Sequence, residues 1–128
     1  MSYTVLVVDD SSIIRYMVKR SITMAELEVA SFHEAVDGFE ALAVLSRTSV
    51  DVMFLDLNMP GMGGVELVEK MARDNLLSKI AVIVFSAEHN PERVEMLLKL
   101  GVRAYLKKPF RPEGVREVIR TVLLGGDP

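Results

Sequence analysis

The sequence lacks cysteine altogether and has only two histidines among its 128 residues. Without cysteine there is no disulfide framework, no thiolate metal site and no thiol nucleophile, and a reducing, intracellular setting fits. Neither His33 nor His89 has a second imidazole or carboxylate beside it at ligand spacing, so we interpret both histidines as structural residues.

Long hydrophobic runs and an excess of basic residues are also absent. No apolar segment approaches the roughly 18 residues of a membrane span, so we expect a cytoplasmic protein without membrane insertion. The formal net charge of −3 argues against direct binding to nucleic acid. With 50% hydrophobic and 26% charged residues, the chain has the composition of a folded globular protein, and we assign residues 1–128 to one domain.

Apolar runs alternate with helical patterns along the chain. The apolar runs without helical period predict five strands, at 4–8, 30–35, 50–55, 80–85 and 103–107. Helical spacing, the possible caps Asp37 and Asn90, and the stop signal Gly101 predict five helices, at 12–25, 38–47, 64–73, 91–100 and 112–124. Runs that are apolar on both faces require a covered parallel sheet, so we predict a doubly wound α/β fold of flavodoxin-like type with five parallel strands and five helices.

Polar residues follow four of the predicted strands, and in doubly wound sheets this is the edge where ligands bind. They are Asp9, Asp10, Asp56, Ser86 and Lys108. Converging carboxylates repel one another, and a hard divalent cation such as Mg²⁺ removes that conflict. Because a hydroxyl and an ammonium group suit an anion, the implied ligand is phosphate, with Asp56 as the nucleophile. The backbone carbonyl of Asn58, in the turn after Asp56, would be a further metal ligand.

Taken singly, each of these residues has a simpler interpretation. Asp10 or Ser11 could cap the first helix, Ser86 could cap a turn, and Lys108 could be a solvated residue at a strand end. The placement of all five at successive strand ends favours a common site over these separate explanations.

The chain resembles the receiver domain of two-component response regulators in four segments, VLVVDDSSIIR, VMFLDLNMPGMGGVEL, VIVFSA and YLKKPF. The resemblance covers essentially the whole chain and points to a single-domain regulator of the chemotaxis type. It implies that Asp56 accepts a phosphoryl group from the phosphohistidine of a histidine kinase or histidine phosphotransfer protein. It also implies that Mg²⁺ binds to Asp9, Asp10, Asp56 and the Asn58 backbone carbonyl.

The same resemblance assigns further roles. Ser86 and Lys108 match the hydroxyl and the lysine of the family, and Tyr105 matches its aromatic switch position. Asn58 and Glu88 flank the nucleophile as in chemotaxis-type members, which implies that they tune self-hydrolysis. Serine at position 86, where threonine is commoner in the family, is a departure because the methyl group that helps to order the switch is missing.

Two surfaces are expected to meet partners. The first helix carries Arg15, Lys19 and Arg20 beside the active edge, so we expect the phosphodonor protein to pack against this helix and the loop of Pro109 and Phe110. The helix at 91–100, the strand with Tyr105 and the last helix are expected to change on phosphorylation. This face would then control a downstream protein target or pair with a second copy of the domain.

Such a domain is not an enzyme in the usual sense, because it catalyses only its own phosphorylation and dephosphorylation. Two alternatives come from other classes. A flavodoxin-like electron carrier would need a hydroxyl- and glycine-rich phosphate loop where this chain has Asp9 and Asp10. An aspartate-based phosphatase would need a second acid at position 58, where this chain has asparagine.

Overall fold

Strands and helices alternate along the chain, as the sequence predicted. The computed structural model describes residues 2–59, 61–87 and 90–124. The strands are β1 (Tyr3–Val8), β2 (Val29–Ala35), β3 (Val52–Asp56), β4 (Ala81–Ser86) and β5 (Ala104–Lys107). The helices are α1 (Ser12–Met24), α2 (Gly38–Arg47), α3 (Gly64–Arg73), α4 (Pro91–Leu100) and α5 (Pro112–Val122).

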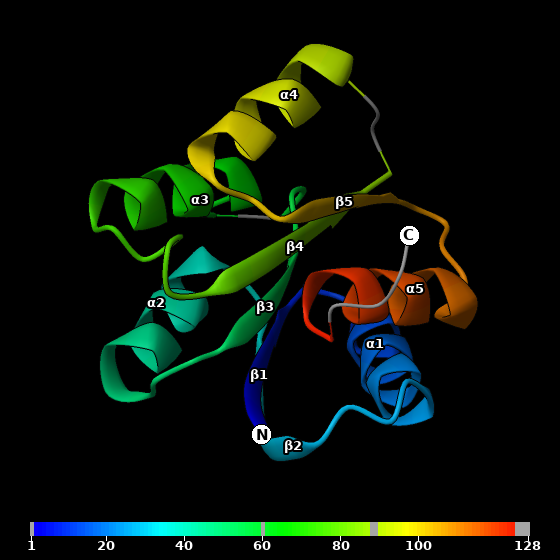
Figure 1. Ribbon diagram of the computed structural model, residues 1–128. Coiled ribbons are helices and arrows are strands. Elements are labelled where there is room, and N and C mark those ends of the chain that lie inside the picture. The colour runs from blue at the N-terminus through cyan, green and yellow to red at the C-terminus, as the bar shows by residue number, and fades with distance from the viewer. Residues whose placement is uncertain (1, 60, 88–89, 125–128) are drawn as a thin grey trace.

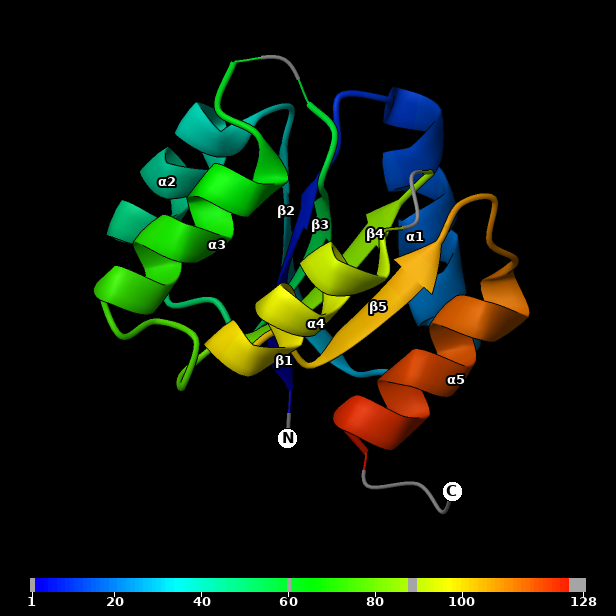
Figure 2. The same ribbon diagram turned by 90° about the horizontal axis from the view of Figure 1, so that it is seen from above.

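The five strands form one parallel sheet in the order β2-β1-β3-β4-β5. Helices α1 and α5 cover one face of the sheet, and α2, α3 and α4 cover the other (Figures 1 and 2). The predicted doubly wound fold is therefore confirmed. The chain first moves outward from β1 to β2 and then crosses to β3 on the other side, so the switch point lies between the ends of β1 and β3.

Side chains of the central strands point alternately into two apolar cores. Val5 and Val7 of β1 pack with α1 and α5, whereas Leu6 and Val8 pack with the helices of the opposite face. Every residue of β3 and β4 is buried. Burying one large apolar side chain contributes about 1.5–3 kcal/mol, so these two strands are among the most firmly held parts of the domain. Their ends give a rigid base for polar groups.

The predicted helix signals are confirmed in detail. The Asp37 carboxylate accepts a hydrogen bond from the Glu40 N–H at 2.9 Å, and the Asn90 side chain accepts from the N–H groups at the start of α4. Gly101 ends α4 with φ of +123°, a conformation that favours glycine. None of the helices in the described part of the chain is long and apolar enough to cross a membrane.

The element boundaries differ slightly from the predicted ones. Strand β3 begins at Val52 instead of Val50, and α5 ends at Val122 instead of Leu124. Asp56 and Ser86 are the last residues of their strands and not the first residues of the loops. Both side chains are therefore fixed by the sheet itself.

Helix α3 starts unusually close to the end of β3. A Cβ atom on Gly64 would lie 2.6 Å from the carbonyl oxygen of Asp56 and 2.6 Å from Cα of Leu57. The Gly64 N–H also donates to the Leu57 carbonyl at 3.1 Å. Only glycine fits at this position, and its small size lets the loop after Asp56 return onto the sheet.

Candidate functional site at the carboxyl edge of the sheet

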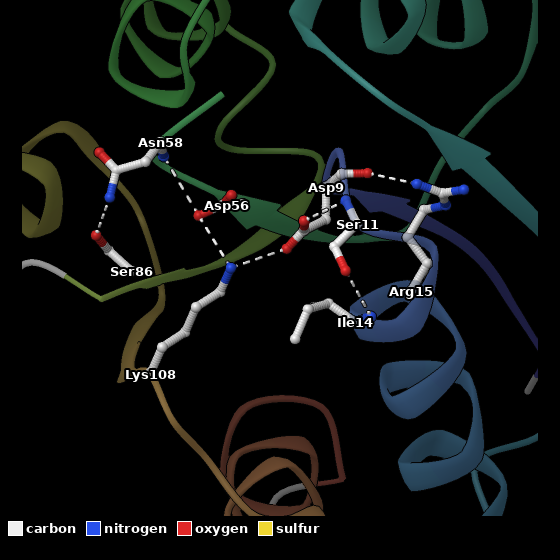
Figure 3. A network of polar contacts seen from close by, with 8 residues as sticks. All are labelled: Asp9, Ser11, Ile14, Arg15, Asp56, Asn58, Ser86 and Lys108. Atoms are coloured by element: carbon white, nitrogen blue, oxygen red, sulfur yellow. Dashed lines mark hydrogen bonds and ion pairs between the residues drawn. The ribbon is translucent and has the colours of Figure 1, made fainter. Parts of the chain in front are cut away.

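The carboxyl ends of β1, β3, β4 and β5 bring the predicted site residues to one edge of the sheet. Figure 3 shows the Lys108 side chain reaching between the carboxylates of Asp9 and Asp56. Its Nζ lies 3.1 Å from Oδ2 of Asp9 and 3.5 Å from Oδ1 of Asp56. Residues 99 positions apart in the sequence are thus joined by a hydrogen-bonded ion pair.

Three carboxylates share this edge. Asp9, Asp10 and Asp56 each offer an oxygen atom within 4.8 Å of the other two. Asp9 and Asp56 are 0% and 3% exposed, whereas Asp10 is exposed. All of these donors are hard oxygens, and the exposed carboxylate leaves one side open to water. This donor set fits a hard divalent cation that keeps part of its water shell.

The turn from β1 into α1 is ordered by its own side chains. Asp9 Oδ1 accepts a hydrogen bond from the Ser11 N–H at 2.8 Å. Ser11 Oγ in turn accepts from the Ile14 N–H at 3.3 Å and caps α1. Of the two caps that the sequence left open, Ser11 is therefore the one observed. The Asp10 side chain has no hydrogen-bond partner among the described residues, and it remains available to a ligand.

Burial raises the pKa of the Asp56 carboxyl, and the negative charge of Asp9 raises it further. The Asn58 N–H, which donates to Asp56 Oδ1 at 3.2 Å, and the Lys108 ammonium act in the opposite direction. Desolvation outweighs these favourable contacts, so the pKa stays above its ordinary value. An ionised Asp56 is therefore costly until further positive charge reaches the edge.

The Asn58 side chain makes a contact that the sequence did not predict. Its Nδ2 donates a hydrogen bond to Ser86 Oγ at 2.8 Å, between residues 28 positions apart (Figure 3). Ser86 is 1% exposed, whereas Asn58 is exposed. The asparagine thus bridges the ends of β3 and β4. Glu88, which was paired with Asn58 as a hydrolysis-tuning residue, lies outside the described residues.

Tyr105 and His33 lie in the strands where the sequence placed them. Tyr105 pairs with Val84 in the β4–β5 register and packs, half-buried, against the core on the α4 side. His33 Nε2 lies 3.3 Å from Ser31 Oγ within β2, in agreement with a structural role. His89 lies outside the described residues.

An apolar hollow lies between α1 and the loop after β5. It adjoins the sheet edge that carries Asp9, Asp10 and Asp56, which we call the acidic edge. The Phe110 ring contacts the buried Phe85 ring edge-on, with the centroids 5.3 Å apart. Lys108 belongs both to this hollow and to the acidic edge. The hollow is lined by Ile14, Met17, Ala87, Lys108, Pro109 and Phe110.

The basic residues of α1 are not equivalent. Arg15 pairs with Glu34 of β2 at 2.9 Å, and the Lys19 ammonium lies 4.9 Å from the centre of the Phe32 ring, also in β2. Arg20 is exposed. Two of the three basic residues that we expect on the phosphodonor surface, Arg15 and Lys19, thus contact β2.

The fold and this edge together define a class of protein, a doubly wound α/β domain with a cation-compatible acidic site at the ends of its central strands. The family model of the response regulator receiver domain matches residues 5–120. The chain belongs to this family, and it is therefore a receiver domain of two-component signalling.

Individual relatives support the same assignment. The chain is similar to chemotaxis protein CheY1 of Helicobacter pylori strain J99, with 38% identity over 119 residues that cover 92% of this chain and 94% of that protein. It is 34% identical to the nitrate/nitrite response regulator protein NarL of Escherichia coli K12, covering 95% of this chain and 55% of NarL. The structure of chemotaxis response regulator CheY4 of Vibrio cholerae matches with a TM-score of 0.81 and 34% identity, covering 96% of this chain and 100% of that one.

Proposed function

We propose that the domain accepts a phosphoryl group on Asp56 from the phosphohistidine of a histidine kinase or histidine phosphotransfer protein, in a reaction that requires Mg²⁺. The observation that carries this proposal is the position of Asp56. It is a nearly buried carboxylate at a strand end, 3.5 Å from a lysine ammonium and within 4.8 Å of two further acids. Lys108 supplies positive charge next to Asp56, and Asp9 and Asp10 supply further carboxylates for a metal ion. Asp56 itself is held in place as the last residue of β3.

In the proposed transfer, a carboxylate oxygen of Asp56 attacks phosphorus. The new P–O bond forms as the P–N bond of the phosphohistidine breaks, and the electron pair of that bond stays on the imidazole nitrogen. The Lys108 ammonium lies where it offsets charge on the transferred group, and the Ser86 hydroxyl is the donor at the end of β4. The domain thus promotes only its own phosphorylation and the later hydrolysis, which Asn58 and Glu88 are proposed to tune.

Asp9, Asp10, Asp56 and the Asn58 backbone carbonyl are the groups that would hold Mg²⁺. When bound, the ion supplies the positive charge that three carboxylates lack and attracts the oxygens of a phosphoryl group. The cost of ionising Asp56, expressed in its raised pKa, supports a requirement for added positive charge.

The output is proposed to run through Ser86 to the face formed by α4, β5 and α5. Ser86 pairs with Lys107 in the β4–β5 register, one residue from Lys108 and two from Tyr105. A phosphoryl group that attracts the Ser86 hydroxyl would bias the Tyr105 ring and the adjoining helix. The partner is a downstream protein or a second copy of the domain, in the cytoplasm and without direct contact to nucleic acid.

The phosphodonor is proposed to pack on α1 and the loop after β5. The apolar hollow that includes Ile14, Met17 and Phe110 supports this docking surface, because it adjoins Lys108. Membership of the receiver family favours this function over an electron carrier or an aspartate-based phosphatase. A colourless purified protein without turnover of a generic phosphate ester would agree with that choice.

Phosphorylation with acetyl phosphate tests the proposal. Intact-mass measurement should show one added phosphoryl group in the presence of Mg²⁺ and none after chelation. Asp56→Asn should abolish the labelling, whereas Asp74→Asn, which removes an exposed surface pair with Lys70, should leave it unchanged. Labelling that survives Asp56→Asn, or that proceeds equally well with the metal chelated, would contradict the proposed function.

A further inference from the structure

Arg15 lies beside the acidic edge without being part of it. Its side chain is only 15% exposed and makes one ion pair and one hydrogen bond to the backbone. Nη1 donates to the backbone carbonyl oxygen of Asp9 at 2.7 Å, and Nε donates to Oε1 of Glu34 in β2 at 2.9 Å. Figure 3 shows the guanidinium extending from α1 to the Asp9 carbonyl.

The Asp9 carbonyl belongs to the peptide that joins Asp9 to Asp10. The other polar groups of Asp9 are engaged too: its N–H donates to the Ala35 carbonyl at 3.0 Å, and its carboxylate contacts Ser11 and Lys108. The peptide after Asp9 therefore has a fixed orientation. Because the Asp10 side chain has no hydrogen-bond partner in the described part of the chain, this peptide is what directs it toward the edge.

We propose that Arg15 is a positioning residue for the two aspartates, acting through the Asp9 carbonyl and held in its own place by Glu34. The inference rests on the proposed function, since it concerns the affinity of that site for Mg²⁺. A guanidinium has a planar fork of N–H donors and can make both contacts at once, whereas a lysine ammonium in the same place is a single point charge.

Charge and position predict opposite effects of Arg15 on a bound cation. If its positive charge were the main influence, neutralising it would strengthen Mg²⁺ binding, because a cation would be repelled less. If it positions the aspartates, removing the fork weakens Mg²⁺ binding even when the charge is kept. Arg15→Lys keeps the charge and removes the fork, and Arg15→Gln removes both.

The experiment is a Mg²⁺ titration of the whole chain, followed by backbone amide shifts of Ser11 and its neighbours. We expect Arg15→Lys and Arg15→Gln to raise the half-saturating Mg²⁺ concentration about tenfold, the lower end of the range found when a group that orients metal ligands is removed. Arg20→Lys, an exposed change on the same helix, should leave it unchanged. Glu34→Ala should weaken binding by a smaller factor and add little to Arg15→Lys, because the two side chains act together.

A second readout separates positioning from a general loss of structure. The rate of phosphorylation by acetyl phosphate at saturating Mg²⁺ should stay near the wild-type rate in Arg15→Lys, while the Mg²⁺ concentration for half of that rate rises. If Arg15→Lys bound Mg²⁺ as tightly as the wild type or more tightly, the positioning role of Arg15 would be refuted and the proposed function would still stand. The same would follow if Arg20→Lys lost as much Mg²⁺ affinity as Arg15→Lys. A wild-type chain that binds no Mg²⁺ would overturn both.

Discussion

Asp56→Asn is expected to stabilise the fold when no divalent cation is present. Asparagine has nearly the shape of aspartate but no charge, and the raised pKa of Asp56 means that its charged form is disfavoured in the folded domain. At an effective dielectric constant of about 20, the Asp9 carboxylate, which lies within 4.8 Å, repels Asp56 by at least about 3.5 kcal/mol, and Lys108 at 3.5 Å attracts it by about 4.7 kcal/mol. These two contributions largely cancel, and water screens the charge of the exposed Asp10.

The burial of the carboxylate then decides the sign. Removing an ion from water costs several kcal/mol, and the hydrogen bond from the Asn58 N–H recovers only part of that cost. We therefore expect Asp56→Asn to raise the free energy of unfolding by about 1–2 kcal/mol at pH 7. For a domain of this size, the corresponding rise in melting temperature is about 3–10 °C.

The pH dependence follows from the direction of the pKa shift. The pKa of Asp56 is higher in the folded state than in the unfolded chain. The ionised Asp56 side chain therefore costs no stability below the ordinary carboxyl pKa, and this cost grows as the pH rises through the pKa of the folded state. The advantage of Asp56→Asn should thus shrink on acidification. Saturating Mg²⁺ should also reduce the stability difference between Asp56→Asn and the wild type. A ligand at 100 times its Kd stabilises the folded state that binds it by about 2.7 kcal/mol, and the wild type has the additional carboxylate ligand.

Thermal unfolding followed by circular dichroism, in chelator and in Mg²⁺ at two pH values, measures these differences. Asp74→Asn is the matched control, because this exposed residue pairs with Lys70 at the surface, and the effect of that pair on stability should stay below about 1 kcal/mol. An Asp56→Asn variant that melts below the wild type in chelator at pH 7 would refute the reasoning. So would an advantage that does not change with pH.

Other substitutions test the remaining parts of the site. Lys108→Ala should slow phosphorylation by acetyl phosphate about 100-fold or more, as the loss of a transition-state donor does, whereas Lys107→Ala should have little effect. Gly64→Ala should destabilise the domain by about 1–3 kcal/mol in urea unfolding, because the new Cβ would clash with the backbone. The Cβ of Gly63→Ala would lie 3.6 Å from the Leu57 carbonyl oxygen, so this control should change stability by less than about 0.5 kcal/mol. Beryllofluoride should shift the amide signals of Tyr105 and α4 in the wild type but not in Ser86→Ala. Wild-type shifts confined to the loops around Asp9 and Asp56 would contradict the proposed switch.

The fold was predictable because local signals and global topology agree. The apolar run from Ile80 to Phe85 is typical of a strand buried on both faces, and Asn90 and Gly101 mark the two ends of α4. The start of β3 was less clear, because Val50 is apolar and only 5% exposed but does not belong to the strand. Composition alone does not reveal where the hydrogen-bonded ladder begins.

The site was predictable in its members but not in its contacts. Parallel strands bring their carboxyl ends together, so the positions of Asp9, Asp56 and Lys108 follow from the topology. The Asn58 contact with Ser86 and the Arg15 contact with Glu34 depend on side-chain directions in loops and across elements. No sequence spacing indicates such pairs. The sequence therefore did not indicate that Arg15, which we expect on the docking surface, also contacts β2.

Charge at this edge links the proposed chemistry of Asp56 to the Ser86 side chain. Three carboxylates and one ammonium leave two net negative charges, which one divalent cation would cancel. A phosphoryl group on Asp56 would bring roughly two negative charges in place of one. Its oxygen atoms would then need a further hydrogen-bond donor at this edge of the sheet. A hydrogen bond that Ser86 donates to a charged acceptor contributes about 1.5–3 kcal/mol, against about 0.5–1.5 kcal/mol for the neutral bond from Asn58 that Ser86 would lose on moving to the phosphoryl group. The difference of roughly 1 kcal/mol favours the new partner about fivefold, so phosphorylation would bias the β4–β5 end without locking it, and Asn58 would help to set that bias.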